Sequence, residues 1–600
     1  MTDTKEKTPH TEMIDAFQDY ANLSLQIYQE SGKELLKAWE QWTSDPEQIL
    51  EQTQNMVRPF NKWMEELLDT QKEKQGLQEA GLAWWKDWLA LLQSKDATSS
   101  EAAKKDKRFQ DQAWENNSYF QFIREAYLLN SRHTLNFINN FPASDPKVTR
   151  QVEFYTKLIL DAFAPTNFLF TNPELTHKTI AERGENLIKG WDNFINDLKR
   201  SGPHLNIKMT DLKAFSLGKN IAATQGKVIF QNDLMQLIQY EPTTKNVNKV
   251  PLLIIPPWIN KFYILDLSPE NSFVNWIVSQ GFTVFLISWV NPTSKLRDKS
   301  FENYMLEGPE TALSVIEEAT GEKSISALGF CLGGTLLASW LAYRQVKGKA
   351  RIKNATFLTS LIDFTDPGDI AVFIDEYQVA TLEKVMKKTG YLDGRMLMNT
   401  FNMLRANDLM WNYYINNYLS GDQPFPFDLL YWNSDCTNLP YAMHSYYLRN
   451  MYLENRLCKN ELVMDGVTID LSKITIPSYS VSTEFDHISP WKTVFKGYKY
   501  LGGEKTFVLG GSGHIAGVIN PPSNNKYGFR FTKDQALLQQ EATSWYNNSE
   551  KREGSWWTHW IDWLTNQSKA TCPARVPGGK IKPIGDAPGD YVRRRVYPIE

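Results

Sequence analysis

The feature that most constrains the fold of this chain is a six-residue turn, Gly329-Phe330-Cys331-Leu332-Gly333-Gly334. Residues 324–328 before it alternate as a short apolar strand does, and residues 335–345 after it are rich in Ala and Leu and predict a helix. A turn this tight needs small residues two positions before and two positions after its apex, and Gly329 and Gly333 meet that need. The pattern predicts a strained strand–turn–helix unit with Cys331 at the apex.

Cys331 is a candidate nucleophile. The turn would place its sulfur beside a helix N-terminus, whose partial positive charge favours the thiolate. Two partners follow in the order acid, then histidine, that an α/β-hydrolase uses: Asp486 after a strand-like run at 476–481, and His514 after one at 506–509. Taken alone, Cys331 is equally well interpreted as a buried, inert thiol, since cysteine is among the most buried residue types. The order and context of all three favour catalysis.

Long stretches of the chain resemble one family, the class I polyhydroxyalkanoate synthases, over roughly residues 109–563. The resemblance implies an α/β-hydrolase fold with Cys331 as nucleophile and Asp486 and His514 as its partners. It also implies polymerisation of an (R)-3-hydroxyacyl-CoA, in particular short-chain 3-hydroxybutyryl-CoA, through an acyl-cysteine thioester with release of CoA. Besides the turn at Cys331, the strings that carry the resemblance are PPWINKFYILDL (256–267), NDLMWNY (407–413), WNSD (432–435), DHI (486–488) and GHIAGVINPP (513–522).

Two backbone N–H groups are candidates for holding an oxyanion. One belongs to Leu332, directly after the nucleophile, and the other to Ile259, in the loop after the apolar run at 252–255. The role of Asp486 stays open: it either orients His514 or acts directly as the base on the 3-hydroxyl of the substrate. His487, next to Asp486, is interpreted as structural.

From residue 226 onward, short apolar strands alternate with helices. Helical stretches at 271–278 and 310–319 lie between strands, and such alternation predicts a mostly parallel sheet covered on both faces. We therefore expect an α/β catalytic domain of the α/β-hydrolase type over residues 206–570. Its expected early strands span 228–230, 235–240, 252–255, 283–287, 324–328 and 355–358.

An insertion at about residues 361–471 interrupts this alternation. It is mostly helical in pattern and crowded with aromatic residues, and an insertion at this point of the fold is typically a lid over the active site. We expect that lid to exclude water. Trp432-Asn433-Ser434-Asp435 lies within it, and the sequence alone assigns this string no chemical role.

The first 205 residues predict a helical N-terminal domain. Tryptophans recur there at helical spacing, a linker is expected at 93–107, and residues 108–129 predict one further amphipathic helix. The tryptophans either pack between helices or form an apolar face for a partner. The family resemblance favours the second interpretation and implies a homodimer and attachment of this domain to the surface of a polyester granule. These tryptophans are Trp39, Trp42, Trp84, Trp85 and Trp88.

Residues 571–600 predict a C-terminal tail. The hydrolase core is expected to end near Trp563, and the segment beyond it is rich in Gly and Pro. The run Arg593-Arg594-Arg595 predicts a solvated tail, with a contribution to coenzyme phosphate binding as the alternative.

Composition and motifs exclude several classes of function. A net charge of −4 gives no electrostatic footprint for nucleic acid. Four cysteines without C-x-x-C spacing predict neither a disulfide framework nor a metal site. Phosphate-binding loops and dinucleotide fingerprints are not apparent. We therefore expect no cofactor, and CoA serves only as the leaving group of the substrate.

The expected location is the cytoplasm. The N-terminus leads into no apolar signal region, and no run approaches the roughly 20 apolar residues of a transmembrane segment. The family resemblance adds association with polyhydroxyalkanoate granules and with the growing polyester chain.

Two other functions compete with polymerisation. A thioesterase or esterase would use the same three side chains and let water release a free hydroxy acid. A noncatalytic granule-coating scaffold would keep the fold without the chemistry. The aromatic insertion argues against the first alternative, and the complete set of Cys331, Asp486 and His514 argues against the second.

Overall fold

The computed structural model describes residues 37, 46–69, 74–93, 101–201, 205–348 and 351–596. Their backbone contacts divide the chain into two compact units. A helical unit comprises the described residues up to 209 together with residues 405–425. A catalytic unit comprises residues 210–404 and 426–596.

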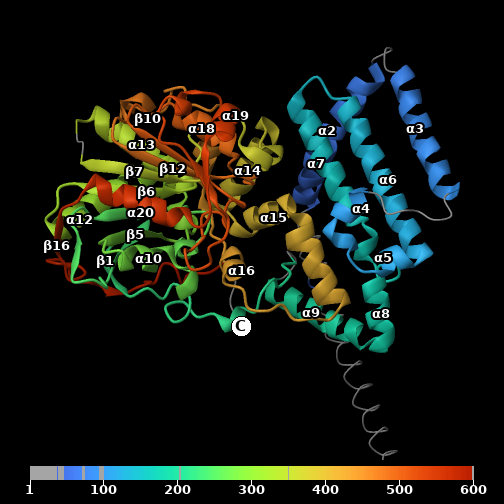
Figure 1. Ribbon diagram of the computed structural model, residues 1–600, viewed down its shortest axis with the longest axis horizontal. Coiled ribbons are helices and arrows are strands. Elements are labelled where there is room, and N and C mark those ends of the chain that lie inside the picture. The colour runs from blue at the N-terminus through green and yellow to red at the C-terminus, as the bar shows by residue number, and fades with distance from the viewer. Residues whose placement is uncertain are drawn as a thin grey trace, which may run out of the picture. The chain divides into compact units, whose positions relative to one another are not determined.

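The catalytic unit is built on one eleven-stranded sheet with helices on both faces (Figure 1). In order across the described sheet, the strands are β15 (Glu550–Arg552), β14 (Phe529–Phe531), β13 (Lys505–Gly510), β12 (Ser478–Thr483), β7 (Ile352–Leu358), β6 (Ile325–Phe330), β4 (Leu252–Ile255), β5 (Val284–Trp289), β2 (Met235–Tyr240), β1 (Gly226–Gln231) and β17 (Gly585–Asp586). The strands from β13 to β5 run parallel, and antiparallel strands extend both edges. Every residue of β4, β5 and β6 is buried, as expected for strands covered on both faces.

The strands expected from the sequence are all present. They correspond to β1, β2, β4, β5, β6 and β7, and the runs before Asp486 and His514 are β12 and β13. β6 continues two residues further than expected, to Phe330, so it runs directly into Cys331. The mostly parallel α/β-hydrolase sheet is therefore confirmed.

Helices cover the sheet on both faces. α13 (Leu332–Val346) lies on one face, whereas α10 (Phe273–Ser279) lies on the other (Figure 1). α10 packs against α20 (Trp556–Gln567), with the rings of Phe273 and Trp557 4.7 Å apart. The remaining helices around this sheet are α11 (Phe301–Met305), α12 (Thr311–Thr320), α18 (Trp491–Tyr498) and α19 (Ala542–Asn548).

The insertion between β7 and β12 is mostly helical, as its pattern predicts. Two short antiparallel strand pairs interrupt it. β8 (Tyr391–Leu392) pairs with the distant β9 (Leu439–Pro440), and β10 (Val463–Met464) forms a hairpin with β11 (Val467–Thr468). Its helical segments are η9 (Gly368–Phe373), α14 (Glu376–Thr389), α15 (Gly394–Leu404), η10 (Asn407–Trp411), η11 (Tyr414–Leu419), α16 (Asp428–Asn433), α17 (Tyr441–Tyr447), η12 (Leu448–Leu453) and η13 (Leu471–Lys473).

The helical unit is formed by antiparallel and crossing helices. In the described ranges these are α2 (Pro46–Asp69), α3 (Lys74–Gln93), α4 (Glu101–Lys105), α5 (Ala113–Asn116), α6 (Ser118–Asn140), α7 (Pro146–Ala162), α8 (Pro173–Ala181) and α9 (Glu185–Ser201). Trp39, Trp42 and residues 94–100 of the expected linker lie outside the described residues, and residues 101–105 of that linker form α4. No helix in the part of the chain that the structure describes is both long enough and apolar enough to cross a membrane.

The single helix expected at 108–129 is wrong. The chain forms α5 and then starts again as α6, which runs on to Asn140. The cause is Asn117, whose backbone is extended and therefore ends α5. Its side-chain oxygen caps α6 by accepting from the N–H of Tyr119 at 3.0 Å. A capping Asn starts a helix more readily than it continues one.

The segment 405–425 leaves the insertion and packs into the helical unit. Gly190 of α9 touches it so closely that an added Cβ would lie 1.9 Å from the carbonyl oxygen of Tyr418. The Tyr418 hydroxyl donates to Asp197 Oδ2 at 2.9 Å, and Lys178 pairs with Asp422 at 2.8 Å. The helical unit is therefore not contiguous in sequence.

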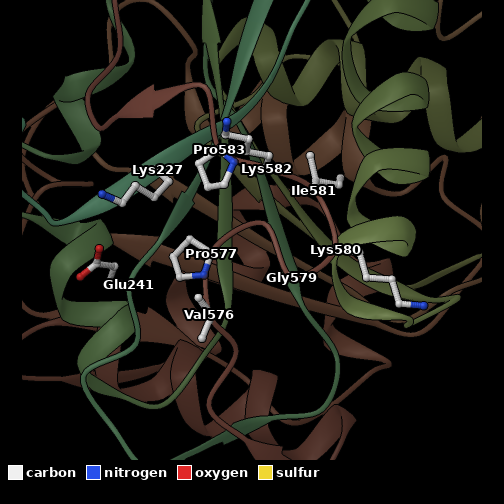
Figure 2. A pocket seen from close by; sticks show the side chains of 9 residues that line it. All are labelled: Lys227, Glu241, Val576, Pro577, Gly579, Lys580, Ile581, Lys582 and Pro583. Carbon is white, nitrogen blue, oxygen red and sulfur yellow. The ribbon is translucent and has the colours of Figure 1, made fainter.

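The expectation of a solvated tail is wrong for residues 571–596. β16 (Thr571–Pro573) pairs with β3 (Asn246–Asn248), β17 pairs with β1, and Val592 is buried. The tail packs because its apolar side chains are buried and its short strands pair with the edges of β1 and β3. The charge run at 593–595 had predicted solvent exposure instead. The tail loop also forms most of a surface pocket that none of the candidate catalytic residues lines (Figure 2). The pocket is lined by Lys227, Glu241, Val576, Pro577, Gly579, Lys580, Ile581, Lys582 and Pro583.

Candidate active site

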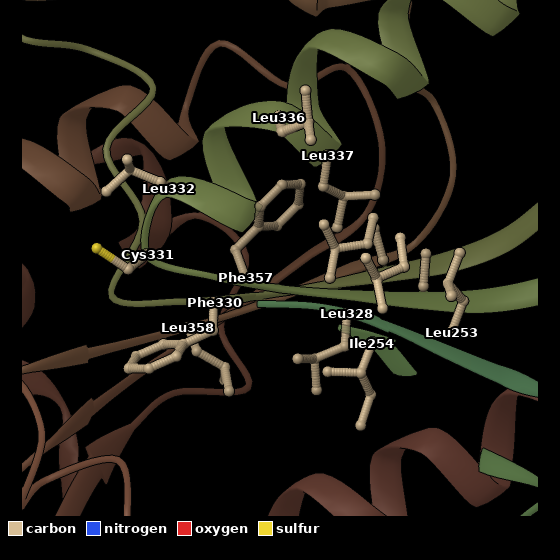
Figure 3. Close-up of a cluster of buried hydrophobic side chains, with 14 of the residues drawn as sticks. Leu253, Ile254, Leu328, Phe330, Cys331, Leu332, Leu336, Leu337, Phe357 and Leu358 are labelled. Carbon is tan, nitrogen blue, oxygen red and sulfur yellow. The ribbon is translucent and has the colours of Figure 1, made fainter. Parts of the chain in front are cut away.

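Cys331 occupies the junction between β6 and α13 in a strained conformation. Its φ is 52°, in the left-handed region that residues with a Cβ rarely adopt. An added Cβ on Gly329 would lie 2.5 Å from the Cα of Gly334, and one on Gly333 would lie 2.0 Å from the carbonyl oxygen of Ile255. Both glycines are therefore required by close backbone approach. Figure 3 shows the sulfur at the apex of the turn, directed away from the apolar side chains around it.

Asp486 and His514 meet beside this turn, each from the loop after its strand. His514 Nδ1 lies 2.7 Å from Asp486 Oδ2. The other carboxylate oxygen, Oδ1, accepts from the backbone N–H groups of Ile488 at 2.9 Å and Ser489 at 2.8 Å. Because the carboxylate only accepts, Nδ1 is the donor, which leaves Nε2 for the hydrogen bond between His514 and the Cys331 side chain. The structure thus brings the three candidates together.

Electrostatics favour a charged imidazole at His514. Burial by itself lowers the pKa of His514, but Asp486 and the Cys331 thiolate outweigh burial and raise that pKa to about 10. The ring also lies against Phe330, with centroids 5.9 Å apart and planes 24° from parallel. This arrangement supports a thiolate–imidazolium pair.

Two tyrosines of the insertion adjoin the nucleophile. Burial raises the pKa of Tyr447 and of Tyr452, and the nearby charge of Cys331 adds to both shifts. The two phenols hydrogen-bond each other, and Tyr447 also meets Thr335 at the start of α13. Aromatic richness pointed to the insertion as a whole, but no sequence signal singled out Tyr452.

The two candidate oxyanion groups border the same turn. Leu332 is the first residue of α13, where a backbone N–H has no partner within its own helix. The loop that holds Ile259 begins against the turn, since a Cβ on Gly333 would also lie 2.9 Å from the carbonyl carbon of Pro256.

Two further expectations concern ligands. Among the residues described, no group of three or more His, Cys, Asp or Glu side chains is placed to hold a metal. Arg595 does not project as a solvated cation, because it pairs with Asp435, whose side chain is 0% exposed, at 3.3 Å. Trp432-Asn433-Ser434-Asp435, to which the sequence assigned no role, therefore contains a buried charge.

The sheet order and the positions of these side chains are those of an α/β hydrolase. Cys331 follows β6 at a sharp turn, and Asp486 and His514 follow β12 and β13 in the chain order of that class. The family model described as "alpha/beta hydrolase fold" matches residues 251–521. A second model, "Poly-beta-hydroxybutyrate polymerase (PhaC) N-terminus", matches residues 105–277.

Within that class, the chain belongs to the poly(3-hydroxyalkanoate) polymerase family. It is 44% identical to the poly(3-hydroxyalkanoate) polymerase of Methylorubrum extorquens over 97% of this chain and 96% of that relative. The Rhizobium meliloti (strain 1021) polymerase subunit is 44% identical over 94% of this chain and 88% of its own length. The polymerase subunit of Cupriavidus necator is 40% identical over 85% of this chain and 87% of its own length.

Proposed function

We propose that this chain polymerises an (R)-3-hydroxyacyl-CoA, with 3-hydroxybutyryl-CoA as the preferred substrate, and releases CoA. The relatives named above are poly(3-hydroxyalkanoate) polymerases, which supports polymerisation as the class of reaction. The observation that carries the mechanism is the hydrogen-bonded array of Cys331, His514 and Asp486 beneath an aromatic insertion. No cofactor enters the proposal, because these side chains supply the nucleophile and move the protons.

The first step is acylation of Cys331. His514 holds the thiol proton at Nε2, and the thiolate attacks the thioester carbonyl. The oxyanion that forms is held by the N–H groups of Leu332 and Ile259. When the carbon–sulfur bond to CoA breaks, His514 returns the proton to the departing sulfur, and an acyl-Cys331 thioester remains.

The second step forms an ester. The 3-hydroxyl of the next (R)-3-hydroxyacyl-CoA gives its proton to His514 and attacks the acyl-Cys331 thioester, so the bond between the acyl carbon and the Cys331 sulfur breaks as an oxygen–carbon bond forms. The lengthened chain leaves as a CoA thioester, and a repeat of the first step returns it to Cys331 with release of CoA. Asp486 acts here by orienting His514. Two backbone N–H groups and the imidazole already engage its two oxygens, and its side chain is 0% exposed, which supports an orienting role over direct contact with a substrate hydroxyl.

Exclusion of water separates this function from that of a thioesterase. Cys331 is buried, and Tyr447 and Tyr452 of the insertion lie beside it. A thioester in such a site is reached by a guided hydroxyl rather than by bulk water. This arrangement favours chain growth over hydrolysis.

The helical unit is proposed to bind the granule surface and to support a homodimer in the cytoplasm. α3 exposes a run of large apolar side chains that a monomer in water would normally cover. The side chains of Trp84 and Trp88 are held against α6, because both indole N–H groups donate to Asn130 Oδ1. The most exposed side chains are those of Leu82, Trp85, Leu89 and Leu92.

The deciding experiment supplies (R)-3-hydroxybutyryl-CoA to the full-length protein and follows CoA release, turbidity and product mass together. We expect CoA release with insoluble polyester. Cys331→Ala should abolish both, whereas Cys572→Ala, at a cysteine outside the site, should change neither. Release of CoA with only free 3-hydroxybutyrate would replace this function with that of a thioesterase, and a labelled acyl adduct on Cys331→Ala would refute the assigned nucleophile.

A further inference from the structure

The loop that holds Ile259 is braced by a segment of the insertion. We call residues 256–261 the oxyanion loop and residues 432–437 the brace. Thr437 donates its backbone N–H to the Ile259 carbonyl at 3.3 Å and its hydroxyl to the Trp258 carbonyl at 3.0 Å. Asn260 and Cys436 form an antiparallel bridge between the two segments.

A third bond fixes the far end of the loop. The indole N–H of Trp432 donates to the Lys261 carbonyl at 2.7 Å. The brace therefore holds the carbonyls on both sides of the candidate oxyanion residue. Because a peptide plane is rigid, fixing the Trp258 carbonyl also sets the direction of the Ile259 N–H, which shares its plane.

The brace carries a buried charge, Asp435. Its Oδ2 accepts from the Tyr263 hydroxyl at 2.9 Å, while Oδ1 is buried without a hydrogen-bond partner among the residues described. Burial raises the pKa of Asp435, and the Lys261 and Arg595 charges oppose that shift. A carboxylate this buried needs cations beside it to remain ionised.

The tail supplies one of those cations and anchors the other. Arg595 pairs with Asp435 Oδ2 at 3.3 Å and lies over the Tyr431 ring at 4.6 Å. The Lys261 ammonium is buried and donates to the Arg594 carbonyl at 2.6 Å. Burial lowers the pKa of Lys261 to about 8, so its charge is the weaker of the two supports.

We infer that Asp435 and Arg595 are positioning residues, through which the C-terminal tail holds the brace and thereby sets the Ile259 N–H of the oxyanion loop. The inference rests on the proposed function, because it assigns a purpose to the oxyanion group used there. Losing Arg595 leaves a buried carboxylate short of a cation, and the brace shifts to let water reach it. A displacement of about 1 Å at a catalytic group can cost about 10²-fold in rate.

The test compares Arg595→Gln with Arg594→Gln in the full-length protein. Both remove one arginine charge from the same stretch of the tail, but the Arg594 side chain lies over Tyr591, whereas the ion pair with Asp435 is made by Arg595. We expect Arg595→Gln to lower kcat for acylation by about 10- to 100-fold with KM nearly unchanged, since an oxyanion exists only in the transition state. Arg594→Gln should match the wild type.

Alkylation of Cys331 by iodoacetamide separates positioning from general damage. This displacement needs the thiolate but forms no oxyanion, so its rate should be the same in Arg595→Gln and the wild type. The double variant Asp435→Asn with Arg595→Gln removes both charges and should recover part of the lost acylation rate. It also serves if Arg595→Gln alone does not fold.

Three results would overturn the inference. The first is an unchanged acylation rate in Arg595→Gln, the second is an equal loss of alkylation and acylation, and the third is a double variant as slow as the single one. A wild-type protein that releases no CoA would instead refute the proposed function, so the two failures are distinguishable.

Discussion

His514 carries the proton on which the proposed chemistry depends. Its pKa is raised to about 10 by Asp486 and Cys331 in spite of burial, so the imidazole is charged through the neutral range. A charged imidazole beside Cys331 stabilises the thiolate that the proposed attack requires. The proton on Nε2 is in place for the departing CoA.

Asp486→Asn tests this account directly. Removing the carboxylate charge should lower the pKa of His514, and both acylation and elongation should slow by about 10²- to 10⁴-fold, as when the third member of a triad is replaced. NMR titration of labelled histidine and single-turnover kinetics measure the two effects. Asp363→Asn, at another buried carboxyl, is the control and should leave the His514 titration unchanged. Normal acylation with lost elongation would assign Asp486 the role of direct base instead.

Sequence order was enough to find Cys331, Asp486 and His514, because each follows a strand and the class fixes their order. Tyr452 could not be found in this way. It sits in η12, a π-helical turn whose hydrogen bonding shifts the side-chain register away from the helical period. Asp435 and Arg595 were also out of reach, since their pairing joins segments about 160 residues apart and leaves no local pattern.

α20 connects the core to the loop that carries His514. The indole N–H of Trp556 donates to the Gly517 carbonyl at 3.0 Å, and that of Trp557 donates to the Val518 carbonyl at 2.9 Å. Both rings are fully buried. The helix therefore fixes the backbone three to four residues beyond His514.

Trp557→Phe should therefore affect rate as well as stability. Loss of this hydrogen bond should reduce the free energy of unfolding by about 0.5–1.5 kcal/mol, because the Val518 carbonyl still accepts from the N–H of Asn520 at 3.0 Å, and the freed loop should lower kcat several-fold. Trp560→Phe is the matched control, because its N–H donates to the Thr356 hydroxyl at 3.0 Å, away from that loop. Urea unfolding and steady-state kinetics would check both variants. Equal effects of the two on kcat would contradict the proposed link.

Local patterns predicted the strands of the sheet well, and the helix at 108–129 and the C-terminal tail poorly. Apolar runs such as β4 and β5 are buried on both faces, so their composition alone identifies them. The helix expected at 108–129 failed because one capping side chain, Asn117, outweighed the apolar period. The tail failed because its strands, β16 and β17, are only two or three residues long and depend on partners far away in sequence.

Buried neutral histidines tie the stability of the protein to pH. Burial lowers the pKa of His444 to about 4, and burial also lowers that of His559 to about 4. A histidine with a depressed pKa takes up its proton more readily in the unfolded chain. Stability is therefore full above the unfolded value near 6.5 and falls as the pH drops from there toward 4.

His444→Gln should weaken this dependence. The wild-type protein should lose about 3 kcal/mol of unfolding free energy through His444 between pH 7 and pH 4, and the variant should lose that much less. Urea midpoints measured at pH 7 and pH 4.5 test the expectation, with His177→Gln at an exposed position as the control. An unchanged difference between the two midpoints in His444→Gln would contradict it.

The split helical unit also bears on how the protein is made. α9 emerges from the ribosome long before residues 405–425, the segment that its Gly190 face is shaped to receive. At common rates of synthesis the delay is roughly 10 to 40 s. For that time this face of α9 waits without its own partner and is open to chaperones or to neighbouring nascent chains. The pace of translation between residues 210 and 404 thus becomes a determinant of the yield of folded enzyme.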